Sequence, residues 1–284
     1  MITVLESIKL ATEYLNQKGI ESGRANAELI LAFIINCKRL DLYLLFDRPL
    51  TDNELQLYRE FLKRRGMFEP LQYILGKTEF FGLELKVTRD VLIPRPETEL
   101  LVEEVLNNIS KENDQLILDI GCGSGNISIA LAASKEKVNI IATDIDDKSL
   151  NLAKENAEKN NVTSKIKFIR HDILKDELTN FPMYDCVVSN PPYVSKENFS
   201  TLQREIKEFE PRHAVTDERD GYTFYRSICK KVSEKIKSKG KLFFEIAEGQ
   251  CNTVTKIMEQ NNFINIIVKK DYQNIDRIVY GELK

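Results

Sequence analysis

The sequence predicts an α/β fold built on a mainly parallel sheet, preceded by a small all-helical domain and a linking β-hairpin. Three patterns predict it: helical spacing of apolar residues up to residue 76, apolar and polar alternation over 78–92, and alternating strands and helices after residue 113. Short strands separated by helices indicate a sheet covered on both faces. We therefore divide the chain into residues 1–76, 77–92 and 93–284.

The N-terminal domain has the pattern of several amphipathic helices. Thr3 with Glu6, and Thr51 with Glu54, fit the capping box, in which a hydroxyl and a carboxylate satisfy free backbone N–H groups. Four apolar residues share one face of the first helix: Val4, Ile8, Ala11 and Leu15. Further helical stretches are expected at residues 25–35, 40–46, 55–62 and 71–75.

The hairpin turns near Gly82, and a loop with Pro94 leads to a helix that starts at Pro96, where a missing N–H costs nothing. Strands are then expected at residues 116–120, 138–143, 165–170, 184–189, 240–246, 264–270 and 277–281. Helices are expected between most of them, notably at residues 126–134, 148–160, 222–237 and 250–261.

The charge balance excludes a protein coated in positive charge for binding nucleic acid. Lys and Arg number 41 against 44 Asp and Glu, a net charge of −3. Residues 1–76 carry ten basic and ten acidic residues, so this domain suits a protein partner better than a phosphate backbone. The alternative is a domain that only buttresses the catalytic one.

The cysteines and histidines argue against a metal site and against a disulfide framework. The five cysteines are scattered without a C-x-x-C pair, Cys186 being most simply a core residue, and there are only two histidines. The N-terminus lacks the pattern of a signal peptide, and no apolar run is long enough to span a bilayer. We expect a cytoplasmic protein without a membrane partner.

The segment LILDIGCGSGN, residues 116–126, indicates a ligand site at the carboxyl end of a strand. Gly121, Gly123 and Gly125 let the backbone turn tightly and approach a ligand before a helix begins. The dinucleotide fingerprint places its third glycine one position later, at Asn126 in this chain. NAD is therefore disfavoured.

Two acids follow the next strands. Asp144 ends the second strand, where a carboxylate can accept hydrogen bonds from ribose hydroxyls, and Asp172 follows the third, where it could accept from an adenine amino group. Either acid alone is more simply a solvated loop residue or a helix cap. Their joint placement indicates a nucleoside-like cofactor.

Together these features resemble the class I S-adenosylmethionine-dependent methyltransferases. The resemblance implies a Rossmann-like seven-stranded sheet whose last strand runs antiparallel. It implies that residues 121–125, Cys122 and Ser124 included, pass beside the amino-acid part of S-adenosyl-L-methionine, that Asp144 holds the ribose, and that Asp172 and Ile173 flank the adenine. The expected product is S-adenosyl-L-homocysteine.

After the fourth strand comes the tetrapeptide Asn190-Pro191-Pro192-Tyr193. In a methyltransferase it looks like the signature of enzymes that methylate a planar nitrogen: an adenine or guanine amino group, or a glutamine amide. Such a nitrogen is a poor nucleophile, and the Asn190 oxygen and the Pro191 carbonyl, beside the cofactor, can accept its two hydrogens. The prolines stiffen this arrangement, the Tyr193 ring can pack on the planar group, and no general base is required.

Longer segments narrow the family. Residues 68–87, 92–106, 187–194, 208–215 and 242–250 closely resemble the peptide-chain release factor N5-glutamine methyltransferases, known as PrmC or HemK. The resemblance implies methylation of the glutamine in the Gly-Gly-Gln loop of class 1 peptide-chain release factors, recognised by the helical domain and hairpin. It also suggests that Arg95, Glu97 and Thr98 border the entrance, although Glu97 and Thr98 could be ordinary first-turn helix residues.

Three alternatives stay open: an amino methyltransferase of adenine or guanine in nucleic acid, a methyltransferase of a ribosomal-protein glutamine, and a non-catalytic binding module with the cofactor fold. The charge balance favours a protein substrate, so no direct nucleic-acid binding is expected. Three places depart from the family pattern: Cys122, the pair Ala247-Glu248 and residues 271–277.

Overall fold

The computed structural model describes residues 2–110 and 112–284 and contains two compact units. The helical unit runs to Lys77 and also takes in Gln203–Phe209. The sheet unit comprises Thr78–Leu202 and Glu210–Lys284. Within the described residues, no helix is long and apolar enough to cross a membrane.

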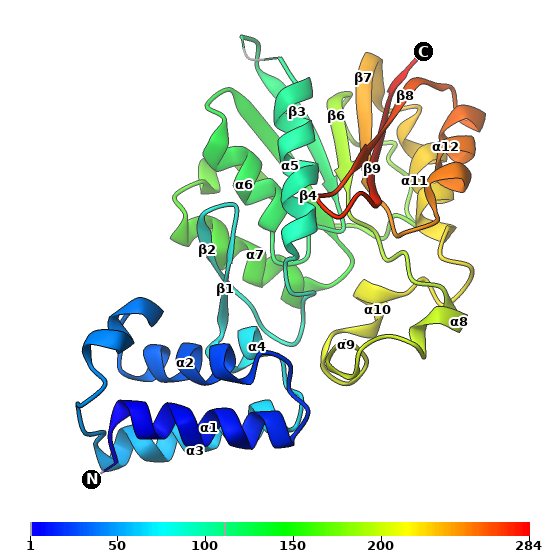
Figure 1. Cartoon of the computed structure of the whole chain (residues 1–284). Coiled ribbons are helices and arrows are strands. Elements are labelled where there is room, and N and C mark those ends of the chain that lie inside the picture. Colours follow the sequence, from blue (N-terminus) through cyan, green and yellow to red (C-terminus); the bar gives the residue numbers. More distant parts are fainter. Residues whose placement is uncertain (1, 111) are drawn as a thin grey trace. The chain divides into compact units, whose positions relative to one another are not determined.

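The helical unit is built on three main helices, shown in blue and cyan in Figure 1. Its elements are α1 (Val4–Gln17), α2 (Gly23–Ile34), η1 (Arg39–Leu44), α3 (Asp52–Gly66), α4 (Leu71–Leu75) and α9 (Arg204–Phe209). Both capping boxes are confirmed: Thr3 caps α1 with Glu6, and Thr51 caps α3 with Glu54. The stretch expected as a helix at 40–46 is instead the 3-10 helix η1.

The α9 segment joins the helical unit although it lies far along the chain. Arg65, buried in α3, donates a hydrogen bond of 2.7 Å to Glu205 of α9. The Arg204 guanidinium lies 4.6 Å from the centre of the Phe68 ring. Sequence patterns gave no sign of this segment's location, because a helix this short shows no clear periodicity.

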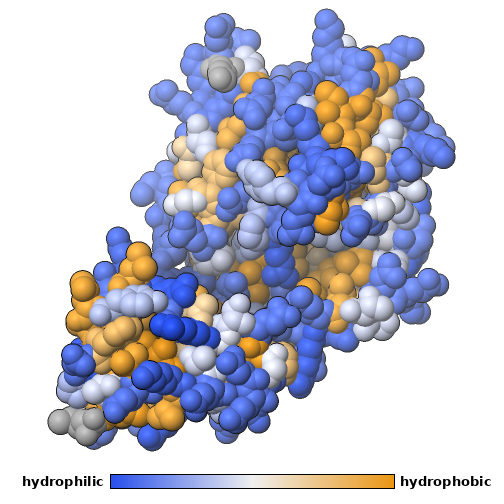
Figure 2. Space-filling view, in the orientation of Figure 1, coloured by the Kyte–Doolittle hydropathy of each residue, from blue (hydrophilic) through white to orange (hydrophobic). Residues whose placement is uncertain are grey.

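The surface of the helical unit combines polar and apolar side chains. Leu40 and Leu44 of η1 are 77% and 86% exposed, and Leu10 of α1 is 57% exposed. Figure 2 shows apolar surface among polar residues on the visible face of this unit.

The sheet unit contains a seven-stranded sheet in the order β5-β4-β3-β6-β7-β9-β8. The strands are β3 (Gln115–Ile120), β4 (Val138–Asp144), β5 (Ile166–Arg170), β6 (Tyr184–Ser189), β7 (Ile236–Glu245), β8 (Phe263–Lys270) and β9 (Asp276–Leu283). The strands from β3 to β7 pair in parallel, and β9 pairs antiparallel with both β7 and β8. The expected seven-stranded sheet with an antiparallel last strand is therefore confirmed.

Apolar side chains on the two faces of the sheet form separate cores. One core lies against α5 (Pro96–Asn108), α6 (Asn126–Ser134) and α7 (Asp147–Lys159), and the other against α11 (Thr223–Val232) and α12 (Cys251–Gln260). Figure 1 shows these two helical layers on either side of the strands. Shorter elements are η2 (Thr163–Lys165), α8 (Lys196–Phe199) and α10 (Arg212–Val215).

The expectation of a helix over 222–237 is wrong at its end. The helix α11 ends at Val232, and the buried Ile236 already pairs with Tyr184 of β6 as the first residue of β7. The pairing of Ile236 with β6 overrides the helical tendency of the charged residues that follow Val232. The other predicted helices and strands of the sheet differ from the structure by a few residues at their ends.

The linking hairpin consists of β1 (Lys77–Phe80) and β2 (Leu83–Lys86). It turns at Phe81 and Gly82, which both have positive φ angles. Residues 87–92, expected to continue the hairpin, form no strand.

Candidate active site

A cavity of about 310 Å³ lies at the carboxyl ends of the parallel strands. This is the edge where ligands bind in sheets of this kind. The predicted site residues that line it are Arg95, Gly121, Cys122, Gly123, Ser124, Asp144, Asp172, Ile173, Asn190, Pro191 and Pro192. Among the described residues, Gly125, Glu97 and Tyr193 lie outside this lining.

The glycine loop between β3 and α6 is held against the end of β4. The backbone N–H groups of Gly121 and Cys122 both donate to the Thr143 carbonyl, at 2.8 and 2.9 Å. Gly125 has a φ of +81°, and a Cβ at this position would lie 3.0 Å from Ile129 and 3.1 Å from Ala153. Gly125 therefore packs the loop onto α6 and α7, while the residues before it face the cavity.

Asp144 is fixed at the end of β4 by two backbone groups. Its Oδ2 accepts from the N–H of Gly123 at 2.9 Å, and its Oδ1 accepts from the N–H of Asp146 at 3.0 Å. Burial raises the pKa of Asp144, while these hydrogen bonds and His213, which lines the same cavity, oppose the rise. Each carboxylate oxygen keeps a lone pair that can accept from a ligand hydroxyl.

Asp172 and Ile173 extend the cavity beyond β5. The Nζ of Lys175 lies 3.3 Å from Asp172 Oδ2, and the N–H of Leu174 donates to Asp172 Oδ1 at 3.0 Å. Ile173 is buried, and its carbonyl accepts a hydrogen bond from Ser227 of α11. This part of the cavity thus combines an apolar wall with one carboxylate.

These residues fit S-adenosylmethionine chemically. Asp144 offers acceptors for vicinal hydroxyls, and Ile173 an apolar surface for a purine. At Gly121 and Gly123 a Cβ would meet no described atom within 4 Å, so the backbone there is open to a ligand.

The strand β6 ends at Ser189, whose hydroxyl donates to the Ile120 carbonyl at 2.7 Å. Next along the chain, Asn190 is half-buried, and its Nδ2 donates to Thr98 Oγ1 at 3.1 Å. None of the hydrogen bonds in the described part of the chain reaches Asn190 Oδ1. With its nitrogen engaged, this amide presents its oxygen as a free acceptor beside Pro191.

Tyr193 is oriented differently from the expectation of a ring facing the target. Its hydroxyl lies 3.4 Å from Glu245 Oε1, and its carbonyl accepts from Gln250 Nε2 at 3.0 Å. Its ring packs against the core on the α11 side of the sheet. Burial and the neighbouring Glu245 raise the pKa of the Tyr193 hydroxyl, which keeps it protonated.

Arg95 and Glu97 line two different pockets. Arg95 lines the cavity and forms an ion pair with the buried Glu210. Glu97 lines a second pocket together with Asp271 and Tyr272. The structure therefore brings Arg95, and not Glu97, to the cavity.

Sequence patterns missed three residues at this site, Glu245, His213 and Phe224. Glu245 ends β7, is 1% exposed and accepts a hydrogen bond of 2.6 Å from Thr98 Oγ1. His213 and Phe224 line the cavity beside the predicted residues. Glu245 ends an apolar run, and both Glu245 and His213 stood inside family segments without an assigned role.

Solved structures with a similar fold include a methyltransferase. The catalytic domain of hMettl16, in complex with a MAT2A 3'UTR hairpin, has a TM-score of 0.58 and 17% identity, covering 82% of this chain and 83% of that chain. A methyltransferase from Pyrococcus furiosus has a TM-score of 0.52 and 15% identity, covering 71% and 89%. At this identity the likeness concerns the fold alone. The sheet therefore has the class I methyltransferase fold.

Sequence relatives identify the family. A family model described as the PrmC N-terminal domain matches residues 6–76, and one described as the methyltransferase small domain matches residues 96–210. The release factor glutamine methyltransferase of Fusobacterium nucleatum is 37% identical over 98% of this chain and 78% of that protein. The enzyme of that name from Geobacter sulfurreducens is 35% identical over 99% and 97%. This chain belongs to the release factor glutamine methyltransferase family.

Proposed function

We propose that this protein transfers a methyl group from S-adenosyl-L-methionine to the side-chain amide nitrogen, N5, of the glutamine in the Gly-Gly-Gln motif of class 1 peptide-chain release factors. Membership of the family supports this assignment. The observation that carries it is a single cavity lined both by Asp144 with the glycine loop and by Asn190 with Pro191. A cofactor region and an amide-binding region thus share one space.

The cofactor would supply an electrophilic methyl group on a sulfonium. Asp144 accepts from the ribose hydroxyls, and Asp172 and Ile173 flank the adenine. The glycine loop, residues 121–125, passes beside the amino-acid part, and Asn190 closes the cofactor region. S-adenosyl-L-homocysteine is then the product that leaves this cavity.

The target amide requires orientation because its lone pair is delocalised into the carbonyl. Asn190 Oδ1 and the Pro191 carbonyl accept the two N–H hydrogens, which favours the charge that develops as the nitrogen attacks. Pro191 and Pro192 restrict the backbone and so hold these acceptors in place. Tyr193 lies outside the cavity lining, so we assign it to supporting this segment through Glu245 and not to stacking on the substrate.

The charges around the site favour a protein substrate over a nucleic acid. The two arginines whose charges lower the pKa of the Tyr193 hydroxyl are engaged: Arg95 pairs with Glu210, and Arg277 pairs with Asp271. Arginines held by carboxylates are poorly available to phosphates. We propose that residues 1–76, with the hairpin at 77–92, recognise the release factor in the cytoplasm, because residues 1–76 carry no net charge and expose apolar side chains.

The experiment is transfer of labelled methyl from S-adenosylmethionine to purified substrates. An unmethylated class 1 release factor should accept one methyl, and the same factor with its Gly-Gly-Gln glutamine replaced should accept none. A ribosomal-protein preparation and total RNA serve as competing substrates. Label that enters RNA and is lost on nuclease treatment would contradict the proposal.

A further inference from the structure

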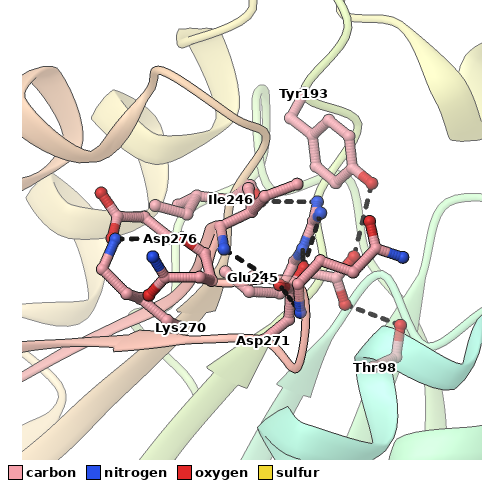
Figure 3. Close-up of polar contacts among 11 residues, drawn as sticks. Thr98, Tyr193, Glu245, Ile246, Lys270, Asp271 and Asp276 are labelled. Carbon is pink, nitrogen blue, oxygen red and sulfur yellow. Dashed lines mark hydrogen bonds and ion pairs between the residues drawn. The ribbon is translucent and has the colours of Figure 1, made fainter.

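Thr98 connects Glu245 to Asn190 through two hydrogen bonds. The Thr98 hydroxyl, in the first turn of α5, donates to Glu245 Oε2 at 2.6 Å and accepts from Asn190 Nδ2 at 3.1 Å. Thr98 and Glu245 are each only 1% exposed. Figure 3 shows the Thr98 hydroxyl and the Tyr193 hydroxyl both directed at the Glu245 carboxylate.

The chemistry of Glu245, Thr98 and Asn190 fixes which group donates and which accepts in the two hydrogen bonds that connect them. An ionised carboxylate can only accept hydrogen bonds, and a hydroxyl has a single hydrogen to donate. When Glu245 is ionised, the Thr98 hydrogen must point to it, so Thr98 can only accept from Asn190. The nitrogen of the Asn190 amide is then directed to Thr98, and the oxygen is left for the substrate.

We propose that Glu245 and Thr98 are positioning residues, which hold the Asn190 amide with its oxygen toward the target glutamine. This inference rests on the proposed function for the identity of the target. Neither residue needs to contact the reacting atoms. Their effect is to remove the flipped orientation of Asn190, in which an NH₂ group would face the N–H hydrogens of the substrate.

The protonation state of Glu245 controls the orientation of the Asn190 amide. The groups that face it are Glu97 and Thr98 from α5, Tyr193, Arg277 from β9 and Tyr225 from α11. Burial raises the pKa of Glu245 to about 7, although Thr98, Arg277 and Tyr193 each lower it. A protonated Glu245 can donate to Thr98, whose hydroxyl can then donate to Asn190 Oδ1 and stabilise the flipped amide. We therefore expect kcat to fall as pH drops below about 7.

A matched pair of variants separates the hydroxyl from the packing. Thr98→Val keeps the branched shape and removes both hydrogen bonds, whereas Thr98→Ser keeps the hydroxyl. We expect Thr98→Val to lower kcat by about 10²-fold with KM for the release factor changed little, because a misdirected group costs this much. The decrease in kcat should be far smaller for Thr98→Ser. Cofactor affinity, measured by calorimetry, should stay within a few-fold in both.

Glu245→Gln tests the titration. Its kcat should fall, and the inflection near pH 7 seen with the wild-type protein should disappear. An activity-independent measurement is the side-chain amide NMR signal of Asn190 in nitrogen-15-labelled protein. That signal should shift with a midpoint near pH 7 in the wild-type protein and in Thr98→Ser, and should not titrate in Thr98→Val.

The results distinguish this inference from the proposed function. Equal losses in Thr98→Val and Thr98→Ser, or an Asn190 signal that does not respond to pH, would overturn the positioning role. A wild-type protein that leaves the release factor unmethylated, while the Asn190 signal titrates through Thr98, would support the positioning role and refute the proposed substrate.

Discussion

Asn190 has one acceptor atom directed by its neighbours, because its amide nitrogen donates to Thr98. Under the proposed function, replacing it with alanine removes an acceptor for the target N–H without changing the residues proposed to hold the ribose. We predict that Asn190→Ala lowers kcat by about 10²–10³-fold, the usual cost of losing one such group. Cofactor affinity by calorimetry should change only a few-fold. An exposed asparagine, changed in Asn139→Ala, is the control, and full activity in Asn190→Ala would refute the assignment.

Asp144 is expected to act on cofactor binding. Its carboxylate faces the cavity and also anchors the N–H of Gly123, so its loss removes a ligand acceptor and loosens the glycine loop. We predict that Asp144→Ala weakens S-adenosylmethionine binding by about 2 kcal/mol, as for hydrogen bonds to a charged group. Asp147→Ala changes an exposed acid of the same turn and should bind normally. Calorimetry that gave equal affinities for the two variants would show that the ribose lies elsewhere.

The element that shapes the cofactor region is the turn between β3 and α6. Gly125 combines a positive φ with close packing on Ala153 and Ile129, whereas Gly82 in the hairpin has a φ of +73° and no described atom within 4 Å of its would-be Cβ. Gly82→Ala should therefore cost only the backbone strain, about 1 kcal/mol. We predict that Gly125→Ala costs about 1–3 kcal/mol more, because of overpacking. Denaturant unfolding measures both, and equal costs would contradict the packing role.

The buried carboxylate of Glu245, in β7, destabilises the folded protein when it is ionised. Burial raises the pKa of Glu245 from 4.5 to about 7, so between these pH values the folded state holds a proton that the unfolded state has lost. Stability therefore falls as pH rises through this window, by ~3 kcal/mol at most. We predict that Glu245→Gln shows a smaller fall in Tm than the wild-type protein between about pH 5 and about pH 8. A fall of equal size would contradict the buried, titrating carboxylate.

A second buried acid provides an internal comparison for that measurement. Burial also raises the pKa of Asp119 to about 7, and Ser128 is its hydrogen-bond donor. Asp119 should thus contribute a pH-dependent loss of stability that persists in Glu245→Gln. The plot of Tm against pH for Glu245→Gln is therefore expected to be flatter than the wild-type plot, but still to fall as pH rises.

At the level of elements, central strands such as β3 and β6 could be predicted because their apolar runs are buried on both faces. The end of α11 could not be, because strand pairing at Ile236 depends on a segment about fifty residues earlier. The short helices α8, α9 and α10 were missed, since four to six residues show no period. The 3-10 helix η1 was expected as an ordinary helix for the same reason.

The candidate site was predictable where its residues follow strand ends in sequence. Asp144, Asp172 and Asn190 each come directly after or at the end of a strand, and parallel strands bring these ends together. Glu245 was not predictable as a partner of Thr98, because 147 residues separate them along the chain. The orientation of Tyr193 depends on the same distant carboxylate.

For the whole molecule, we expect the helical unit to bind the protein substrate and not to take part in the methyl transfer. Removing residues 1–76 should reduce activity on an intact release factor at least tenfold more than activity on a short Gly-Gly-Gln peptide, because only the intact factor can contact this unit. Circular dichroism and cofactor binding by calorimetry establish that the truncated chain is folded. Equal losses on both substrates would contradict a docking role.

The most direct measurement is the position of the methyl group on the substrate. The purified protein is incubated with S-adenosylmethionine and an unmethylated class 1 release factor, and the factor is mapped by peptide mass spectrometry. The account predicts one methyl on the glutamine of the Gly-Gly-Gln peptide, and none with the Asn190→Ala variant. An unmodified glutamine, from a wild-type protein that binds the cofactor, would contradict the proposed reaction.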